Sequence, residues 1–334
     1  MIADLIHKIA SFDQEDHVYY PRPSLAGTDR CIRQMVYWGL GFERTPLPGR
    51  TLVIFSDSSF HEDLTLDWLR KSAFKVHSEQ MKVDCKYPMR TGSIDALITD
   101  MTGRDWLLEH KAINHFTFEK YWNGEIPNDY FSQTCIYYDA LLKVSADIAG
   151  AILLIKNKNT AAYLEYLITY DGLNYVTKCR TNSQGETKQM NVILENIVDK
   201  SCDKFLTVTD YINKKTLPKR QYEVDDWQCN YCGYSGHCWG DYQKEFFELK
   251  TDAMLPEEVA TMVKYYKELG SQKSDTTKEY DGLRDKIKAV MKENSVRQGY
   301  AGEYVCELKL QKNNTERLYI KNMYKLEKGE SDNG

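Results

Sequence analysis

Two carboxylates and a lysine lie close together in the sequence, at Asp95, Glu109 and Lys111. They belong to segment 92–111, which consists of two short, largely apolar runs separated by turn-forming residues at 100–105, and this predicts a two-stranded hairpin. Glu109 and Lys111 then share one face of their strand, because side chains alternate with a period of two. Such a trio suits a divalent metal ion and a lysine that orients a metal-bound water. Taken alone, the pattern is more often a surface hairpin with ordinary charges.

A second group of residues that could bind a ligand is the C-x2-C-x5-C run of Cys229, Cys232 and Cys238. Two glycines within this run let the backbone turn. Three thiols at this spacing can surround one soft metal centre, which needs a fourth ligand. His237 is the nearest candidate and would complete a zinc site. Cys31 is a distant candidate, and four thiolates suit an iron–sulfur cluster or zinc. Without a metal, the three cysteines would be small buried residues.

Composition leaves the function open but narrows the class of protein. The 334 residues are 42% hydrophobic and 28% charged, as in soluble globular proteins of one or two domains. We expect a cytoplasmic protein without a membrane partner, because the sequence lacks a membrane-spanning run and a signal-peptide pattern. Nine cysteines then favour metal ligands and buried thiols over disulfides. With a net charge of −5, binding of nucleic acid requires a local basic face or bound metal ions.

The apolar periodicity predicts an α/β/α core with a mixed sheet, because a helix, three strands, a helix and a strand follow one another. Helices are expected at 1–11, from Ser24 through Tyr37, at 57–71, at 130–142 and across much of 171–202, and strands at 80–85, 91–98, 106–113, 150–155 and 163–170. Beyond Pro256, two helical stripes and a hairpin between residues 305 and 320 predict a separate C-terminal region.

Taken together, these residues resemble the PD-(D/E)XK nuclease superfamily, and within it the RecB-like exonucleases that carry a four-iron cluster. The matching features occur in the family's order: Cys31, His61 with Glu62, the G-S-I-D run that ends at Asp95, Glu109-His110-Lys111, the Q-x-x-x-Y element from Gln133 to Tyr137, and the cysteine run followed by Trp239. The likeness covers roughly residues 21–239. It is closest to CRISPR adaptation exonucleases and their phage-encoded relatives. One departure is Asp57, where the family usually has a glycine.

The resemblance implies a restriction-endonuclease-like α/β/α nuclease domain over residues 1–240 and a helical and hairpin extension over 241–334. One or two Mg²⁺ or Mn²⁺ ions would be bound by His61, Asp95 and Glu109, with the His110 carbonyl as a further ligand. Lys111 would orient or help deprotonate the attacking water. On one helix face, Gln133 and Tyr137 would hold the scissile strand. Glu62 would assist the metal site or be a solvated helix charge. A capping or core role is the alternative for His61, and core packing is the alternative for Tyr137.

For the cysteines, the resemblance implies a structural [4Fe–4S] cluster held by Cys31, Cys229, Cys232 and Cys238, with zinc as the alternative metal. Such a cluster would close the nuclease domain much as a disulfide would. DNA would be contacted by lysines near residues 156–158 and 214–220, and by the rings of Tyr19, Tyr20, Tyr121 and Trp122, on which single-strand bases can stack.

The expected function is that of a metal-dependent DNA exonuclease that hydrolyses phosphodiester bonds from a strand end, in a bacterial host or encoded by a phage. Recombination, end processing and CRISPR-type adaptation are the processes implied. The expected partners are single-stranded or duplex DNA ends, proteins of those processes and further copies of the chain. Two alternatives stay open: a structure-specific or restriction-like endonuclease on the same scaffold, and a non-catalytic module that binds DNA or a protein partner.

Overall fold

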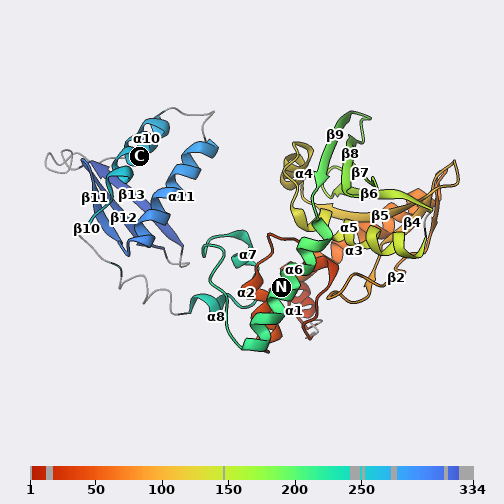
Figure 1. The fold of residues 1–334 in the computed structure, drawn as a ribbon, viewed down its shortest axis with the longest axis horizontal. Helices are drawn as coiled ribbons and strands as arrows, with labels where there is room; N and C mark the ends of the chain where they lie inside the picture. The colour runs from red at the N-terminus through yellow and green to blue at the C-terminus, as the bar shows by residue number, and fades with distance from the viewer. Residues whose placement is uncertain are drawn as a thin grey trace. The chain divides into compact units, whose positions relative to one another are not determined.

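A computed structural model describes residues 2–12, 18–145, 147–240, 249, 253–271, 277–311 and 315–322. The chain divides into two compact units, Met1–Gln221 and Tyr222–Gly334 (Figure 1). The boundary expected after residue 240 therefore lies after Gln221 instead, and the cysteine run belongs to the second unit. Within the described ranges, no helix is long and apolar enough to cross a membrane.

The first unit is a mixed α/β structure built on a seven-stranded sheet. Its helices are α1 (Ile2–Ala10), the 3-10 helix η1 (Pro23–Leu25), α2 (Ile32–Gly39), α3 (Gly49–Arg70), α4 (His115–Trp122), α5 (Asn128–Val144) and α6 (Ile197–Lys214). Its strands are β1 (Lys75–His77), β2 (Lys82–Val83), β3 (Gly92–Ser93), β4 (Ala96–Thr99), β5 (Asp105–Ile113), β6 (Ile148–Asn157), β7 (Tyr163–Tyr170), β8 (Tyr175–Asn182) and β9 (Thr187–Leu194).

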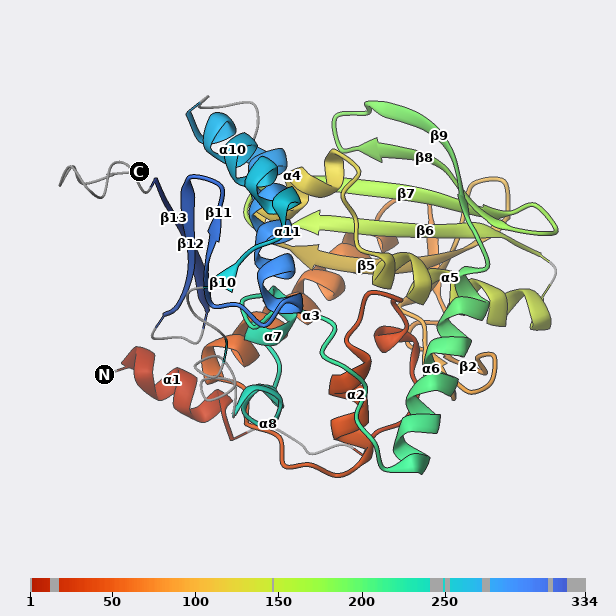
Figure 2. The same ribbon diagram turned by 60° about the vertical axis from the view of Figure 1, so that its left-hand side comes forward.

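The strand order is β1-β4-β5-β6-β7-β8-β9, and Figure 2 shows β6 between β5 and β7. Strands β5 and β6 run parallel and the other neighbours run antiparallel, so the expected mixed sheet is confirmed. A separate two-stranded ribbon joins β2 to β3. Strand β2 is shorter than the strand expected at 80–85.

Helices cover both faces of the sheet around β5. On one face, Leu66 of α3 packs against Leu108. On the other face, Leu107 belongs to the large core that includes Ile136 of α5. Because side chains alternate along a strand, odd-numbered residues of β5 face α5 and even-numbered residues face α3. This alternation places the side chains of Glu109 and Lys111 on one face of the sheet and that of His110 on the other.

The prediction of a helix across much of 171–202 is wrong, because residues 175–194 form a β-hairpin. Val176 pairs with Ile193 and Thr177 with Val192, and Gly185 adopts a positive φ of 81° in the turn. Most residues of β9 are exposed, so this strand lacks the buried, alternating pattern that marks a strand in sequence. A helix follows only at α6.

Two helix starts also differ from the expectation. Helix α2 begins at Ile32 with Cys31 as its N-cap residue, whereas Ser24 lies in the preceding 3-10 helix. Helix α3 begins at Gly49 rather than at 57. Its first turns carry Ile54 and Phe55, whose side chains are about half exposed, so no stripe of core residues marks the start.

The second unit contains a four-stranded sheet and a pair of helices. Its elements are α7 (Trp227–Asn230), α8 (Ser235–Trp239), β10 (Ala253–Met254), α10 (Glu257–Ser271), α11 (Thr277–Glu293), β11 (Gln298–Ala301), β12 (Tyr304–Leu310) and β13 (Glu316–Asn322). The strand order is β10-β11-β12-β13, with the first pair parallel and the others antiparallel. Val263 and Ile287 of the helices pack with Cys306 of the sheet. The two helices and the hairpin expected beyond Pro256 are present.

Candidate active site

The hairpin predicted from residues 92–111 is formed by β4 and β5, which pair Ala96 with Leu108 in antiparallel register. Asp95 immediately precedes β4. Its Oδ2 accepts a hydrogen bond of 2.6 Å from the backbone N–H of His110. This bond holds the Asp95 carboxylate beside the strand that carries Glu109.

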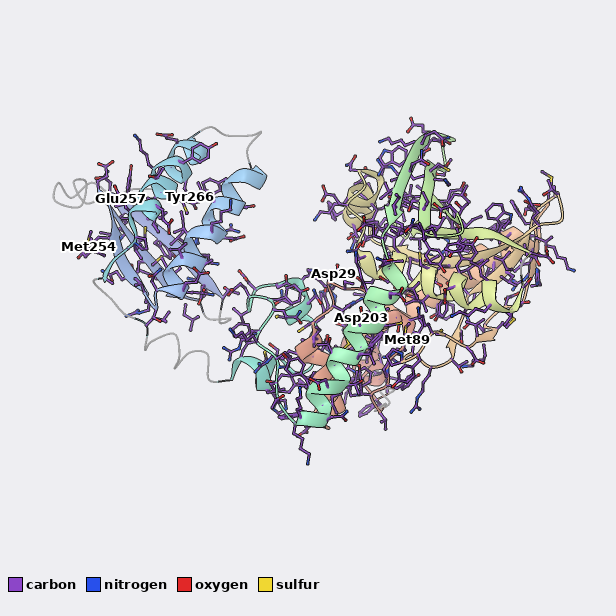
Figure 3. The ribbon with its side chains drawn as sticks, in the orientation of Figure 1. Asp29, Met89, Asp203, Met254, Glu257 and Tyr266 are labelled. Atoms are coloured by element: carbon purple, nitrogen blue, oxygen red, sulfur yellow. The ribbon has the colours of Figure 1, made fainter. Side chains whose placement is uncertain are left out.

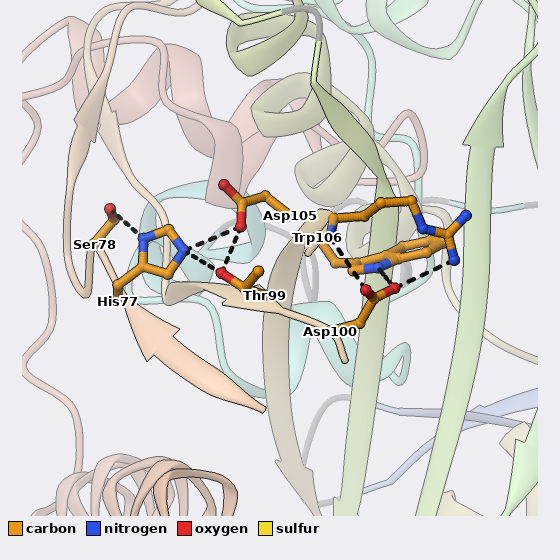
Figure 4. Close-up of polar contacts among 7 residues, drawn as sticks. His77, Ser78, Thr99, Asp100, Asp105 and Trp106 are labelled. Atoms are coloured by element: carbon orange, nitrogen blue, oxygen red, sulfur yellow. Dashed lines mark hydrogen bonds and ion pairs between the residues drawn. The ribbon is translucent and has the colours of Figure 1, made fainter. Parts of the chain in front are cut away.

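The turn of the hairpin is closed by Asp100, as Figure 4 shows. Its Oδ1 accepts hydrogen bonds from the hydroxyl and backbone N–H of Thr102 and from the backbone N–H of Arg104. Its Oδ2 accepts a bond of 2.9 Å from the indole of Trp106. These bonds hold the pKa of Asp100 below its usual range, and the bond from the Thr102 hydroxyl has the largest effect. The turn is therefore fixed by its own side chains, and the register of β4 on β5 follows from it.

Glu109 is the most deeply buried carboxylate of the hairpin, with a fully buried side chain. Its Oε1 accepts an ion-paired hydrogen bond from Nζ of Lys111, whereas its buried Oε2 has no hydrogen-bond partner in the described part of the chain. Burial and then repulsion by Asp95 raise the pKa of Glu109 to about 8. A buried carboxylate oxygen without a donor is costly, and a hard cation would relieve that cost.

Glu62 of α3 is a third carboxylate near this pair. Its Oε1 accepts a hydrogen bond of 3.1 Å from Nε2 of Gln80. Burial and then the charge of Asp95 raise the pKa of Glu62 to about 7, and burial raises the pKa of Asp95 as well. Glu62 also contributes to the raised pKa of Glu109. The three carboxylates thus form one mutually repelling acidic cluster.

Lys111 lies among these carboxylates with a side chain that is 21% exposed. Burial alone would lower its pKa, but the charges of Glu109 and Asp95 outweigh burial and raise it. Its ammonium also lies 5.7 Å from the ring centroid of Tyr130. Lys111 is therefore a fixed cation at neutral pH, partly open to solvent.

Gln133 and Tyr137 lie on α5, on the face of the sheet that carries Glu109. Burial and then the charge of Glu109 raise the pKa of Tyr137, and the neighbouring Gln133 side chain opposes part of this rise. The Tyr137 ring packs tightly on β3, because a Cβ built at Gly92 would lie 2.5 Å from its Cε1. With only 5% exposure, Tyr137 is a core residue as well as a neighbour of the acidic cluster. Only glycine allows this approach without a shift.

The structure does not bring the His61 side chain to the carboxylates. Burial and the charges of Lys156 and Lys158 lower the pKa of His61, and Asp57 is its acidic neighbour. Glu62 is a charged neighbour of Asp95 and Glu109, whereas His61 is a charged neighbour of His110, whose side chain lies on the α3 face of β5. Glu62 is the one that faces Asp95. The sequence singled out the pair, but the choice between them depends on how α3 packs.

The His110 side chain lies on the α3 face of the sheet, away from Glu109. Its Nε2 is 3.2 Å from Oγ1 of Thr65. Burial lowers the pKa of His110 to about 3, so its imidazole is neutral. Only the backbone of His110 reaches the acidic cluster, through its bond to Asp95.

Across the described ranges, no group of three or more His, Cys, Asp and Glu side chains is already arranged around a single metal position. The acidic cluster of Glu62, Asp95 and Glu109 is therefore drawn together by the fold but not closed into a ligand shell. One oxygen of Glu109 already accepts a hydrogen bond from Lys111. Reorientation of carboxylate side chains would have to accompany binding of a cation.

The cysteine run lies on α7, α8 and the turn between them. The side chain of Asp226 caps α7 by accepting a bond of 2.8 Å from the backbone N–H of Gln228. Cys229 and Cys232 line a cavity of about 290 Å³, whose other lining residues include Ser235 and Trp239. Cys85, Cys135, Cys179, Cys202 and Cys306, which lie outside the run, are free thiols. Only two cysteines of the run line this cavity, and among the described residues no three Cys, His, Asp or Glu side chains surround one metal position.

Comparison with known proteins adds no family to this description. No family model matches the chain, and no curated protein matches it. The crystal structure of SSO0001 aligns with a TM-score of 0.36 at 15% sequence identity, over 71% of this chain and 96% of that one. A similarity of this size carries no inference about fold or function.

Proposed function

We propose that the chain is a metal-dependent deoxyribonuclease of the PD-(D/E)XK type, which hydrolyses phosphodiester bonds from a DNA end. The observation that carries the proposal is the buried Glu109 carboxylate, which has one oxygen on Lys111 and the other without a donor in the described ranges, beside Asp95. Glu316 on Lys292 in the second unit shows the same pattern, so the proposal also rests on the order and spacing of Asp95, Glu109 and Lys111 that resemble the nuclease motif. Buried carboxylates that repel one another are unfavourable by themselves. Such a group is more often found at a site where a bound ligand offsets the repulsion.

Mg²⁺ or Mn²⁺ is the group that would complete the site, because hard carboxylate oxygens are the donors these ions prefer. Asp95 and Glu109 would hold it, with Glu62 as a further acidic ligand. When bound, the ion supplies Lewis-acid stabilisation and lowers the pKa of a coordinated water. The acidic cluster has the charge to bind a divalent cation and, without one, repels a DNA phosphate.

The residues around the cluster have separable roles in this proposal. Lys111 is held as a cation by Glu109 and Asp95, so it can stabilise negative charge that develops on a phosphate oxygen. The bond from the His110 N–H fixes the orientation of Asp95. Gln133 presents a partly exposed amide from α5, which can position the strand to be cut, and the buried Tyr137 packs beside it.

The requirement for a free DNA end separates an exonuclease from an endonuclease on the same scaffold. We expect the purified protein to digest linear DNA with Mg²⁺ or Mn²⁺ and to leave covalently closed circles intact. Gel analysis of matched linear and circular forms of one plasmid measures this. Nicking of circles as fast as linear DNA is digested would establish the endonuclease instead. No metal-dependent cleavage of either form would favour a non-catalytic binding module.

We propose in addition that the cysteine run of Cys229, Cys232 and Cys238 holds a structural [4Fe–4S] cluster. Protein purified without oxygen should be brown and contain about four irons per chain. Cys229→Ser should lose most of this iron. Cys179→Ser, which changes a partly exposed thiol in β8, should retain it. Colourless protein with stoichiometric zinc would contradict the iron–sulfur assignment and support the zinc alternative.

A further inference from the structure

A group of cationic and aromatic side chains lies outside the acidic cluster, around the ring of Tyr20. The guanidinium of Arg22 is 5.8 Å from the centroid of this ring, and that of Arg90 is 5.9 Å from it. Arg22 also lies 5.1 Å from the ring centroid of Trp38. Two guanidinium groups are thus gathered on one tyrosine, although their like charges repel.

Neither of these guanidinium groups is neutralised within the part of the chain that the structure describes. No ion pair or side-chain hydrogen bond links Arg22 or Arg90 to an acidic residue there, and the buried Nε of Arg22 has no hydrogen-bond partner. Arg104 offers a contrast. It also lies over an aromatic ring, 5.4 Å from the centroid of Trp106, but it forms a 3.2 Å ion pair with Asp100. The guanidinium N–H groups of Arg22 and Arg90 are therefore available to donate hydrogen bonds to an anion.

The backbone places this group next to the candidate active site. The N–H of Arg90 donates to the carbonyl of Pro21 at 3.3 Å, so the two segments lie side by side. Two residues further along, Gly92 is in close contact with both Pro23 and Tyr137. Met89, labelled in Figure 3, is buried and anchors the chain, while Arg90 is exposed. Since Tyr137 is also an electrostatic neighbour of Glu109, the cationic group borders the site from the η1 side.

We propose that Tyr20, Arg22 and Arg90 bind the single-stranded end of the DNA substrate, an assignment that rests on the proposed nuclease function of the neighbouring site. The two guanidinium groups would donate to phosphate oxygens, which would neutralise their mutual repulsion. The partly exposed Tyr20 ring holds the guanidinium groups together and offers an aromatic surface to a base. A flexible single strand can follow such a compact group, whereas a duplex needs a broader basic face.

The test is a binding measurement that does not depend on cleavage. Fluorescence anisotropy of a labelled single-stranded oligonucleotide is recorded in EDTA with the full-length protein at several salt concentrations. For the double variant Arg22→Ala/Arg90→Ala we expect at least about tenfold weaker binding, with a salt slope that is smaller by about 1.4 because two phosphate contacts are lost. Tyr20→Ala should also weaken binding. Arg104→Ala is the matched control and should bind as the wild type does.

A second double variant, Arg22→Lys/Arg90→Lys, separates loss of contacts from loss of fold. It keeps both charges, so it should retain most of the salt slope but bind less tightly than the wild type. Wild-type binding and slope in the alanine double variant would overturn the proposal, as would a loss confined to blunt duplex DNA. If the variants lose binding while the wild type cleaves no DNA, only the nuclease function fails. If the wild type cleaves DNA and the variants bind normally, only this assignment fails.

Discussion

Glu109→Gln is expected to abolish DNA cleavage while leaving the fold intact. Glutamine has the size of the buried side chain and keeps an oxygen that can accept from the Lys111 ammonium. It removes the carboxylate that the proposed metal ion needs. Changes one shell further from a metal ion cost roughly 10- to 100-fold, so we expect a loss of more than about 100-fold in the single-turnover cleavage rate.

The matched control for this variant is Glu165→Gln. Glu165 also lies on a strand of the same sheet, where its side chain is exposed and outside the acidic cluster. It should cleave DNA at the wild-type rate. Urea unfolding should give Glu109→Gln a midpoint close to that of the wild type, since glutamine keeps the side-chain size and an acceptor oxygen for Lys111, while Asp95 still opposes the Lys111 charge. Full activity in Glu109→Gln would show that the hairpin is not the catalytic centre.

The stability difference between the wild type and Glu109→Gln is expected to change with pH in the absence of metal ions. The folded-state pKa of Glu109 is about 8, above the usual value of 4.5, so folding takes up a proton between these values. The contribution of Glu109 to stability therefore falls as pH rises from about 4.5 to 8, by an amount on the order of 4 kcal/mol. The contribution of Glu62 to stability also falls as pH rises, between about 4.5 and its folded-state pKa of about 7.

Only the difference between the two proteins is diagnostic, because other buried groups titrate with the opposite sign. The pKa of His110 is lowered to about 3 and that of Lys204 to about 7 by burial, so each makes stability rise with pH in part of the range. Lys111 has a raised pKa and stays charged throughout. Urea titrations in EDTA at pH 5.5, 7 and 8.5 measure the difference.

Mg²⁺ or Mn²⁺ should stabilise the wild type most at pH 8.5 and should have a much smaller effect on Glu109→Gln. Such a metal ion binds the charged carboxylates and so favours the folded state as their protons leave. A pH-independent stability difference, together with equal metal effects on both proteins, would contradict the account of Glu109 as a metal ligand with a raised pKa.

How far the sequence predicts the site depends on how local each contact is. Asp95, Glu109 and Lys111 lie on one tight hairpin, so strand alternation and turn residues suffice to bring them together. The contribution of Glu62 rather than His61 depends on the rotation of α3 on the sheet. Apolar residues such as Phe60, Leu64 and Trp68 are exposed on α3, and the helix therefore offers no clean core stripe that fixes this rotation.

The same distinction explains the fold. The mixed sheet could be predicted where strands are buried and apolar, as in β5 and β6. The β8–β9 hairpin could not, because β9 is largely exposed and lacks a periodic core face. Likewise, the chain divides at Gln221, although the resemblance implied one domain through residue 240. Compactness depends on contacts between distant residues, which composition and local spacing do not report.

The central claim is that the Asp95–Glu109–Lys111 hairpin is a metal-dependent centre for DNA hydrolysis. Its most direct test is release of label from end-labelled linear DNA by the wild type and Glu109→Gln, each with Mg²⁺, with Mn²⁺ and with EDTA. We predict progressive release by the wild type with at least one of the two metals, none in EDTA and none by Glu109→Gln. Equal release by both proteins, or no release by the wild type with either metal, would contradict the claim.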